Sequence, residues 1–206
     1  SHRLRAGEAL SAITDDLRQR FGIGPRILPM SDDPVRTRIG TDQGWLDFQD
    51  WFVRLRAEPL ARAVQFAGVE KARAQPALLD ALQAKPRGIV ICPSNPFISI
   101  EPILALPGLR DAIKASGAPV VAVSPIIAGQ AVKGPTARMF EALGITPSAA
   151  AVAARYGDLL HGYVMEKGDD AEGIAPRVFH AETLMRNLDD KMNLARQVLA
   201  AIDAIR

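Results

Sequence analysis

The chain has 206 residues, 48% of them hydrophobic and 23% charged, which suits one packed α/β domain with a small insertion. Its formal net charge of +2 excludes the basic excess typical of nucleic-acid-binding domains. A single cysteine, Cys92, excludes a disulfide framework and a cysteine-based zinc site. No stretch approaches the roughly 20 apolar residues that span a bilayer, and no signal peptide opens the chain, so we expect no membrane partner and a cytoplasmic location.

The first part of the chain predicts a helix, a strand and a separate small unit. Residues 7–21 carry apolar side chains at helical spacing from Leu10 to Phe21, which predicts an amphipathic helix. Residues 26–30, RILPM, predict a short buried strand. Residues 35–75 hold both tryptophans and predict a hairpin, an amphipathic helix and a further strand. We expect this segment to form an α+β insertion or cap.

From Gly88 onward, apolar strands alternate with helices. The expected strands are 88–92, 118–125 and 162–166, and the expected helices are 107–116, 134–144 and 183–202. This alternation is typical of a mostly parallel sheet covered on both faces. The sequence therefore predicts a Rossmann-like three-layer α/β domain made of residues 1–34 and 76–206, with residues 35–75 inserted. Within it, Cys92 is expected to pack in the core.

Polar turns follow three of the predicted strands. The turns are Ser31-Asp32-Asp33-Pro34, then Pro93-Ser94-Asn95-Pro96 with Ser99 close behind, and Ser124-Pro125. Ligands of open parallel sheets bind outside the carboxyl ends of the strands, so these turns are expected to converge. Prolines stiffen such turns and leave backbone N–H groups able to point at an anion. Each turn taken alone also fits a purely structural role.

Charged residues near these turns suggest a phosphate site. Lys133 and Gly134 lie just before a predicted helix, and a helix N-terminus with a lysine suits phosphate. Asp32 and Asp33 supply the oxygen ligands that Mg²⁺ prefers, although an Asx turn or N-cap explains them equally. His161 and His180 lack partner motifs, so we predict that neither is catalytic. None of the signatures GxxxxGK[ST], GxGxxG, GxSxG or HExxH is present. Residue chemistry alone thus indicates an anion-binding α/β domain.

Longer strings are more specific than single residues. The segments PSNPFISIEPIL, PGLRDAI and VAVSPIIAGQAVKGP occur in this order after the upstream strings LPMSDDPVRTRI and GWLDFQDWFVRLR. The strings ARYGDLLHGYVME and TLMRNLDDKMNLA follow them. Together they resemble the CofD-like family of 2-phospho-L-lactate transferases over nearly the whole chain.

The resemblance implies a transferase of deazaflavin coenzyme (F-420) biosynthesis. Such enzymes move a phosphorylated three-carbon acid from a guanosine-diphosphate-linked donor to a hydroxyl of the deazaflavin precursor, releasing GMP with help from Mg²⁺. With the turns above, it implies donor binding by Ser94, Asn95, Pro96, Ser99, Ser124 and Gly134. Lys133 is expected to neutralise phosphate charge, Asp32 and Asp33 to bind Mg²⁺, and Lys133 and Asp32 to be catalytic. Trp45 and Phe48 suit an aromatic wall for the flat acceptor ring, and a packed satellite core explains these aromatic residues equally.

The sequence departs from the family pattern in two places. Family members begin with a Gly-rich strand–loop–helix that helps to cradle the nucleotide, and this chain contains no equivalent. Ala128 stands where the family tends to have glycine, which is tolerable unless the backbone there has a positive φ.

Other functions remain alternatives to the deazaflavin reaction. One is a transferase or phosphatase acting on another phosphorylated metabolite, and another is a nucleotide-binding module without catalysis. The three-carbon acid is open among phospholactate, phosphoenolpyruvate and phosphoglycerate. A homodimer is expected, because the apolar insertion needs cover.

Overall fold

A computed structural model describes residues 2–131 and 136–206 of the chain. The α-helices are α1 (His2–Arg5), α2 (Leu10–Arg20), α3 (Pro76–Gln83), α4 (Glu101–Leu104), α5 (Leu109–Ala115), α6 (Thr136–Ala142), α7 (Ala149–Tyr156) and α8 (Leu188–Ile205). The strands are β1 (Arg36–Thr41), β2 (Gly44–Asp47), β3 (Ala63–Ala67), β4 (Ile89–Ile91), β5 (Val120–Val123), β6 (Ile126–Ile127), β7 (Gln130–Ala131), β8 (Gly162–Glu166) and β9 (Arg177–Ala181). Two π-helical turns, η1 (Asp50–Arg54) and η3 (Pro96–Ile100), and two 3₁₀ turns, η2 (Val69–Lys71) and η4 (Gly157–Leu159), complete the described elements.

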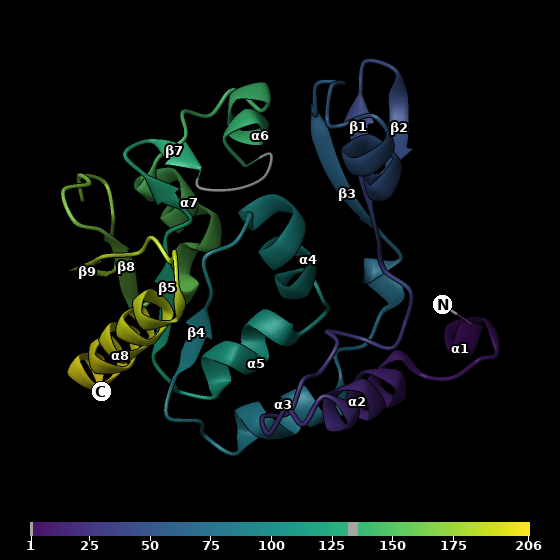
Figure 1. Cartoon of the computed structure of the whole chain (residues 1–206), viewed down its shortest axis with the longest axis horizontal. Coiled ribbons are helices and arrows are strands. Elements are labelled where there is room, and N and C mark those ends of the chain that lie inside the picture. Colours follow the sequence, from purple (N-terminus) through teal and green to yellow (C-terminus); the bar gives the residue numbers. More distant parts are fainter. Residues whose placement is uncertain (1, 132–135) are drawn as a thin grey trace.

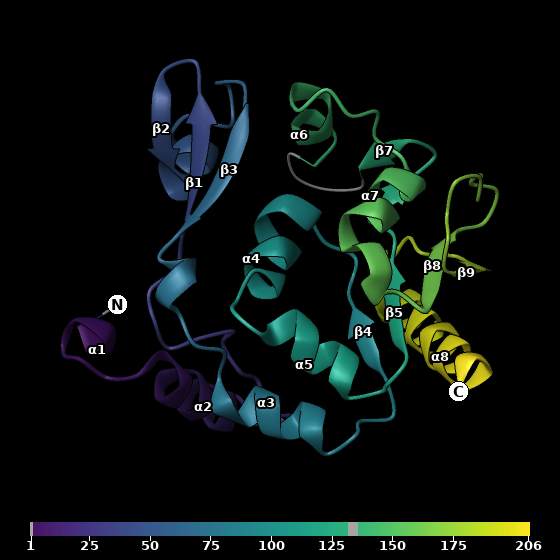
Figure 2. The ribbon, with the colours of Figure 1, turned by 180° about the vertical axis from the view of Figure 1, so that it is seen from behind.

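The main sheet has four parallel strands in the order β4-β5-β8-β9. Strand β5 is buried throughout, as expected of a parallel strand with both faces covered. Its alternate side chains point to opposite faces, so Val120 and Ala122 join one core cluster and Val121 and Val123 another. Helix α8 covers the second face, while α4, α5 and α7 lie on the first (Figure 1, Figure 2). The prediction of an α/β domain with a parallel sheet is therefore confirmed.

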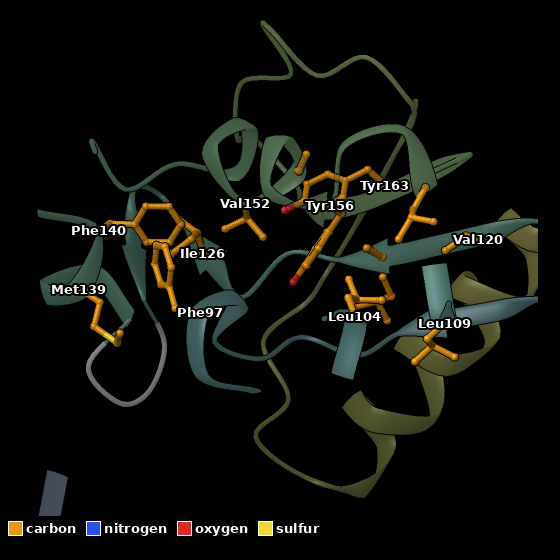
Figure 3. Packing of buried hydrophobic residues seen from close by; sticks show 14 of the residues in the cluster. Phe97, Leu104, Leu109, Val120, Ile126, Met139, Phe140, Val152, Tyr156 and Tyr163 are labelled. Atoms are coloured by element: carbon orange, nitrogen blue, oxygen red, sulfur yellow. The ribbon is translucent and has the colours of Figure 1, made fainter. Parts of the chain in front are cut away.

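The larger core cluster extends past the carboxyl ends of β4 and β5. Figure 3 shows Phe97, which follows β4, beside Phe140 of α6. Their rings meet edge to face with 4.7 Å between centroids, an arrangement that aromatic quadrupoles favour. Ile126 of β6 and Val152 of α7 belong to the same cluster. The turns that leave the sheet are thus anchored by packing.

A second sheet, in the order β2-β1-β3, is antiparallel and lies within residues 35–75. The predicted hairpin is confirmed, with Thr41 paired to Gly44 across its turn. The predicted helix after it is shorter than expected and forms the π-helical turn η1, in which Trp51 is buried and its indole N–H donates to the carbonyl of Pro59 at 2.8 Å. This sheet lies beyond α4 from the main sheet (Figure 1, Figure 2). Its role as a cap stays a prediction.

Of two predictions about the first 30 residues, one is confirmed and one is wrong. The predicted helix is present as α2, although Leu17 and Phe21 on its apolar side are 47% and 77% exposed. Residues 26–30 form no strand. Pro29 has no N–H to give to a sheet, and the Met30 carbonyl instead accepts a hydrogen bond from the backbone of Gln75 at 2.9 Å.

The prediction of a core position for Cys92 is also wrong, because this residue is exposed. Strand β4 lies at one end of the main sheet, so the residues that follow it have neighbours on only one side. No described helix combines the length and the apolar character needed to cross a bilayer.

Candidate functional site

The Pro93–Pro96 turn leaves the carboxyl end of β4, where ligands of parallel sheets usually bind. Asn95 caps η3: its side-chain oxygen accepts hydrogen bonds from the backbone N–H groups of Phe97 at 2.9 Å and Ile98 at 3.3 Å. Pro96 occupies the first helical position, where its missing N–H costs nothing. The Asn95 oxygen and these two N–H groups therefore stabilise the turn. Because the N–H groups of Phe97 and Ile98 already donate to Asn95, they are not free to bind an anion.

The hydroxyl groups of this turn are differently placed. Ser94 and Ser99 are half-buried, and neither hydroxyl forms a hydrogen bond with another described residue. The backbone N–H of Ser99 donates to the carbonyl of Asn95 at 3.0 Å, which fixes the serine within the turn. The structure thus brings Ser94, Asn95, Pro96 and Ser99 together in one turn.

Ser124 shapes the turn that follows β5. Its hydroxyl oxygen accepts from the backbone N–H of Ile126 at 3.1 Å and lies 3.0 Å from the Ile126 carbonyl, to which it donates. The residue is buried, so its hydroxyl supports the start of the β6–β7 hairpin. Lys133 and Gly134, expected to bind phosphate, lie outside the described residues.

Asp169 is a carboxylate near the strand ends that the sequence analysis did not single out. It follows β8 and accepts a hydrogen bond from the backbone N–H of Ala128 at 2.9 Å, while its other carboxylate oxygen is buried without a partner among the described residues. Burial raises the pKa of the neighbouring Tyr163, and the charge of Asp169 raises it further. Ala128 has a φ of 47°, the left-handed conformation in which the departure from glycine matters. Applying the strand-end rule to β8 as well would have found Asp169.

Glu101 and Arg155 form a second constellation that the sequence analysis missed, although Glu101 stands in the PSNPFISIEP string. Glu101 begins α4 directly after η3 and pairs with Arg155 of α7. Burial raises the pKa of the Glu101 carboxyl, and the charges of Arg155 and Arg110 offset part of this rise. The guanidinium of Arg155 also lies over the ring of Phe97. The pair therefore ties α7 to the turn after β4.

Asp32 bonds to Ser11 at the start of α2 and to Gln75 just before the start of α3. These two helices lie away from the carboxyl edge of the main sheet (Figure 1). Asp32 accepts hydrogen bonds from the backbone and hydroxyl of Ser11, both at 2.7 Å, and from the amide of Gln75 at 2.9 Å. Burial acts to raise the pKa of Asp32, but these hydrogen bonds outweigh it, so the pKa lies below its ordinary value. Asp33 accepts from the backbone of Arg73 at 2.9 Å.

These two carboxylates do not form a metal-binding cluster. Residues 2–131 and 136–206 contain no group of three or more acidic, histidine or cysteine side chains placed to hold a metal ion. Both oxygens of Asp32 already accept hydrogen bonds from protein groups. The donor set seen here therefore does not fit a Mg²⁺ ion bound by protein ligands alone.

The aromatic residues expected to meet the acceptor differ in exposure. Phe48 stacks on Phe52 with 5.4 Å between ring centroids and 10° between planes, and it packs against the core cluster. Trp45 of β2 is exposed, with its ring against Gly40. Trp45 thus offers an open aromatic surface, whereas Phe48 is engaged in packing.

Polar turns at the carboxyl ends of a parallel sheet define a ligand-binding α/β domain. The family model described as 2-phospho-L-lactate transferase CofD matches residues 2–201, and the chain belongs to this family. The predicted family and the prediction of a transferase are therefore confirmed.

Relatives with known names support the same assignment. The chain is 41% identical over 206 residues to the 2-phospho-L-lactate transferase of Methanosarcina mazei, a match that covers 98% of this chain and 67% of the relative. It is 40% identical over 218 residues to the phosphoenolpyruvate transferase of Kitasatospora aureofaciens, covering 100% and 67%. The fold resembles the crystal structure of protein BH3568 from Bacillus halodurans with a TM-score of 0.64 at 14% identity, covering 97% of this chain and 68% of the other. The chain thus spans about two thirds of the length of these proteins.

Proposed function

We propose that the chain transfers a phosphorylated three-carbon acid from a guanosine-diphosphate-linked donor to a hydroxyl of the deazaflavin precursor in coenzyme F-420 biosynthesis. The observation that carries this proposal is the family match over residues 2–201, which includes the turns after β4 and β5. Relatives of nearly equal identity are named for 2-phospho-L-lactate and for phosphoenolpyruvate. The identity of the acid is therefore left to experiment, with phosphoglycerate as a third candidate.

In the proposed reaction, the acceptor hydroxyl oxygen attacks the phosphorus that carries the three-carbon acid. A new P–O bond forms, the bond from that phosphorus to the GMP oxygen breaks, and GMP leaves with the electron pair, while the hydroxyl proton passes to solvent or a base. Because charge develops on non-bridging phosphate oxygens, catalysis depends on positioning and on donors aimed at these oxygens.

The turn after β4 is the proposed seat of the donor diphosphate. Ser94 and Ser99 would donate their hydroxyls to phosphate oxygens, while Asn95 and Ser124 hold the two turns in shape through their buried hydrogen bonds. Lys133 and Gly134 remain proposed phosphate ligands on the basis of sequence alone. Trp45 remains the proposed wall for the acceptor ring, because its ring is exposed.

A requirement for Mg²⁺ also remains a proposal, and we assign no step to it. Mg²⁺ in nucleotide sites is often held by substrate phosphates with one or two carboxylates, so a protein cluster is not required. A homodimer that covers exposed apolar residues of the segment 35–75, such as Val53 and Leu60, is likewise a proposal.

The test is a transfer assay with the purified chain. Guanosine-diphosphate-linked lactate, enolpyruvate and glycerate donors are each incubated with Mg²⁺ and the deazaflavin precursor, and both GMP and the mass of the product are measured. We expect GMP release that requires the deazaflavin acceptor. Release with a different acceptor supports a transferase for another metabolite, and guanine nucleotide binding without release from any donor supports a non-catalytic module.

A further inference from the structure

Two tyrosines, Tyr156 of α7 and Tyr163 of β8, lie fully buried in the larger core cluster. Neither hydroxyl group has a hydrogen-bond partner among residues 2–131 and 136–206. Figure 3 shows both phenol oxygens directed toward the side of the core on which Ile126 and Phe97 lie. Most buried polar side-chain atoms in native proteins have a partner, either in the protein or in ordered water, so these two hydroxyls require an explanation.

Tyr163 is distinguished from Tyr156 by a second buried polar atom nearby. Asp169 follows β8, and the chain turns back there, since the backbone N–H of Asp169 donates to the carbonyl of Glu166 at 3.3 Å. One carboxylate oxygen of Asp169 accepts from the backbone N–H of Ala128 at 2.9 Å. The other is buried and has no partner in the described part of the chain. The loop after β8 therefore brings an unused acceptor to the region where Tyr163 has an unused donor.

Ser124 supplies a third oxygen atom on the same face of the sheet. Ala122 of β5 pairs with Tyr163 of β8, and Ser124 lies two residues beyond Ala122, so the side chains of Ser124 and Tyr163 point to the same face. Burial raises the pKa of the Tyr163 hydroxyl, the Ser124 hydroxyl acts to lower it and the charge of Asp169 raises it, so both groups lie close to that hydroxyl. The Ser124 hydroxyl donates to the carbonyl of Ile126 and accepts from its N–H, which leaves one lone pair able to accept again.

We propose that an internal water molecule joins these three side chains and holds the turn at Ala128 in place. The water accepts a hydrogen bond from Tyr163 and donates one each to the buried oxygen of Asp169 and to Ser124. Three hydrogen bonds are typical of a buried water molecule. A metal ion lacks the ligands it needs here, since no three acidic, histidine or cysteine side chains gather anywhere in the described ranges.

The consequence of this bridge for activity rests on the proposed function. Strand β6 lies beside β8, and the β6–β7 hairpin that holds Ala128 runs into the segment with Lys133, a proposed phosphate ligand. The water therefore fixes the hairpin in the position needed for donor binding. Asp169 and Tyr163 act as positioning residues and do not touch the substrate.

Tyr163→Phe removes one oxygen atom and tests the bridge by the sign of its effect. Removing a hydroxyl that has no partner leaves stability unchanged or raises it, whereas removing one that holds a buried water lowers it. We expect urea unfolding to show the folded-to-unfolded ratio reduced about fivefold. After scaling to Val121 in the sheet core, hydrogen exchange at the Ala128 amide should be about fivefold faster. In an Asp169→Ala background, Tyr163→Phe should change neither quantity further, because the bridge is already broken.

Tyr156→Phe is the matched control, because it removes an equally buried hydroxyl from α7. It should leave hydrogen exchange at Ala128 unchanged. A high-resolution crystal structure of the wild type should show the water within hydrogen-bonding distance of the Tyr163 and Asp169 oxygens. The positioning role is tested by calorimetry with GDP, whose affinity should fall about fivefold in Tyr163→Phe and stay unchanged in Tyr156→Phe.

Four outcomes overturn the water bridge. Two are a Tyr163→Phe variant as stable as the wild type, and a crystal structure with a direct bond between Tyr163 and Asp169. A third is faster exchange at Ala128 in Lys133→Met, matching that in Tyr163→Phe, which assigns the buried oxygen to that lysine. The fourth is a urea midpoint that rises with Mg²⁺ in the wild type but not in Asp169→Ala, which assigns the position to a cation.

The GDP titration separates this inference from the proposed function. A wild type that binds no GDP contradicts the proposed function alone, since stability and hydrogen exchange still decide the presence of the water. Wild-type GDP affinity in a Tyr163→Phe variant with faster exchange at Ala128 contradicts the positioning role alone.

Discussion

The guanidinium of Arg155 lies over the ring of Phe97, with 4.8 Å between its central carbon and the ring centroid. The same guanidinium pairs with Glu101, one turn further along the chain from Phe97. One side chain of α7 therefore holds both an aromatic and an acidic residue of the segment that leaves β4. Because Asn95 caps the start of that segment, its position relative to the sheet depends on contacts at both of its ends.

We expect Arg155→Met to lower the free energy of unfolding by about 1–3 kcal/mol at pH 7, because it leaves the partly buried Glu101 carboxylate without its nearest cation. Arg155→Lys should cost less, since it keeps the charge but loses the planar stacking on Phe97. Urea unfolding of both variants measures the difference. The double variant Glu101→Gln with Arg155→Met is the control and should be more stable than Arg155→Met alone. Equal stability of the wild type and all three variants would show that the Glu101–Arg155 pair does not contribute to the free energy of unfolding.

The cost of Arg155→Met should depend on pH. Burial already raises the pKa of Glu101, and removing Arg155 raises it further in the folded state. A carboxyl with a raised folded pKa favours folding below its unfolded pKa of about 4.3 and loses this contribution as the pH rises toward the folded value. The stability gap between wild type and variant should therefore be smaller at pH 4 than at pH 7. An equal gap at both pH values would contradict the assignment.

Asn95 offers a pair of variants that separate folding from binding. Asn95→Ala removes the acceptor of two backbone N–H groups and should cost about 1 kcal/mol of stability, as lost N-caps do. Asn95→Asp keeps an acceptor oxygen at the cap and should be more stable than Asn95→Ala. Its negative charge should nevertheless weaken GDP binding at least tenfold by calorimetry, if the donor diphosphate lies on this turn. Wild-type affinity of Asn95→Asp would place the diphosphate elsewhere.

We expect Asp32 to contribute to the stability of the fold, because it accepts hydrogen bonds from Ser11 and Gln75. Asp32→Ala leaves Ser11 and the buried amide of Gln75 without their acceptor, which should cost about 1–3 kcal/mol. The pKa of Asp32 is lowered in the folded state, so its contribution is present at neutral pH and is lost as the pH falls through that lowered value. Thermal unfolding at pH 7 and pH 3 measures both effects. A shift in the Mg²⁺ concentration needed for transfer, seen in Asp32→Ala and in Asp33→Asn, would instead support the metal role predicted from the sequence.

Much of the α/β core was predictable because its strands are continuous apolar runs. The strands at β4, β5 and β8 and the hairpin of β1 and β2 lie where periodicity and turn residues place them. Strand β9 was missed because Arg177 and His180 interrupt its apolar character, and it forms through pairing with β8 alone. Residues 26–30 have the apolar composition of a strand, but Pro29 removes a hydrogen-bond donor and no partner strand is available among the described residues.

The turns at the sheet edge were predictable in position but not in detail. The strand-end rule correctly locates Ser94, Asn95 and Ser124 at neighbouring strand ends. Which of their polar atoms form hydrogen bonds within the protein depends on the local backbone conformation of each turn. The side-chain oxygen of Asn95, for example, accepts hydrogen bonds only because η3 begins directly after it. Cys92 is exposed because β4 lies at the edge of the sheet. The order of strands in a sheet cannot be predicted from the hydrophobic pattern of a single segment.

Ala128 should be improved by the glycine that its conformation favours. With a φ of 47°, Ala128 adopts a left-handed backbone conformation that costs a residue with a Cβ atom about 1 kcal/mol. Replacing it with glycine removes this cost, but part of the gain is lost because glycine loses more backbone entropy on folding. Ala128→Gly should therefore raise the free energy of unfolding by up to about 1 kcal/mol, since its N–H can still donate to Asp169. The reverse change next to it is the matched control: Gly129 has a φ of 72°, so Gly129→Ala should destabilise by about 1 kcal/mol. Urea unfolding of both variants measures the pair, and a destabilised Ala128→Gly beside a tolerated Gly129→Ala would show that this turn is not left-handed in solution.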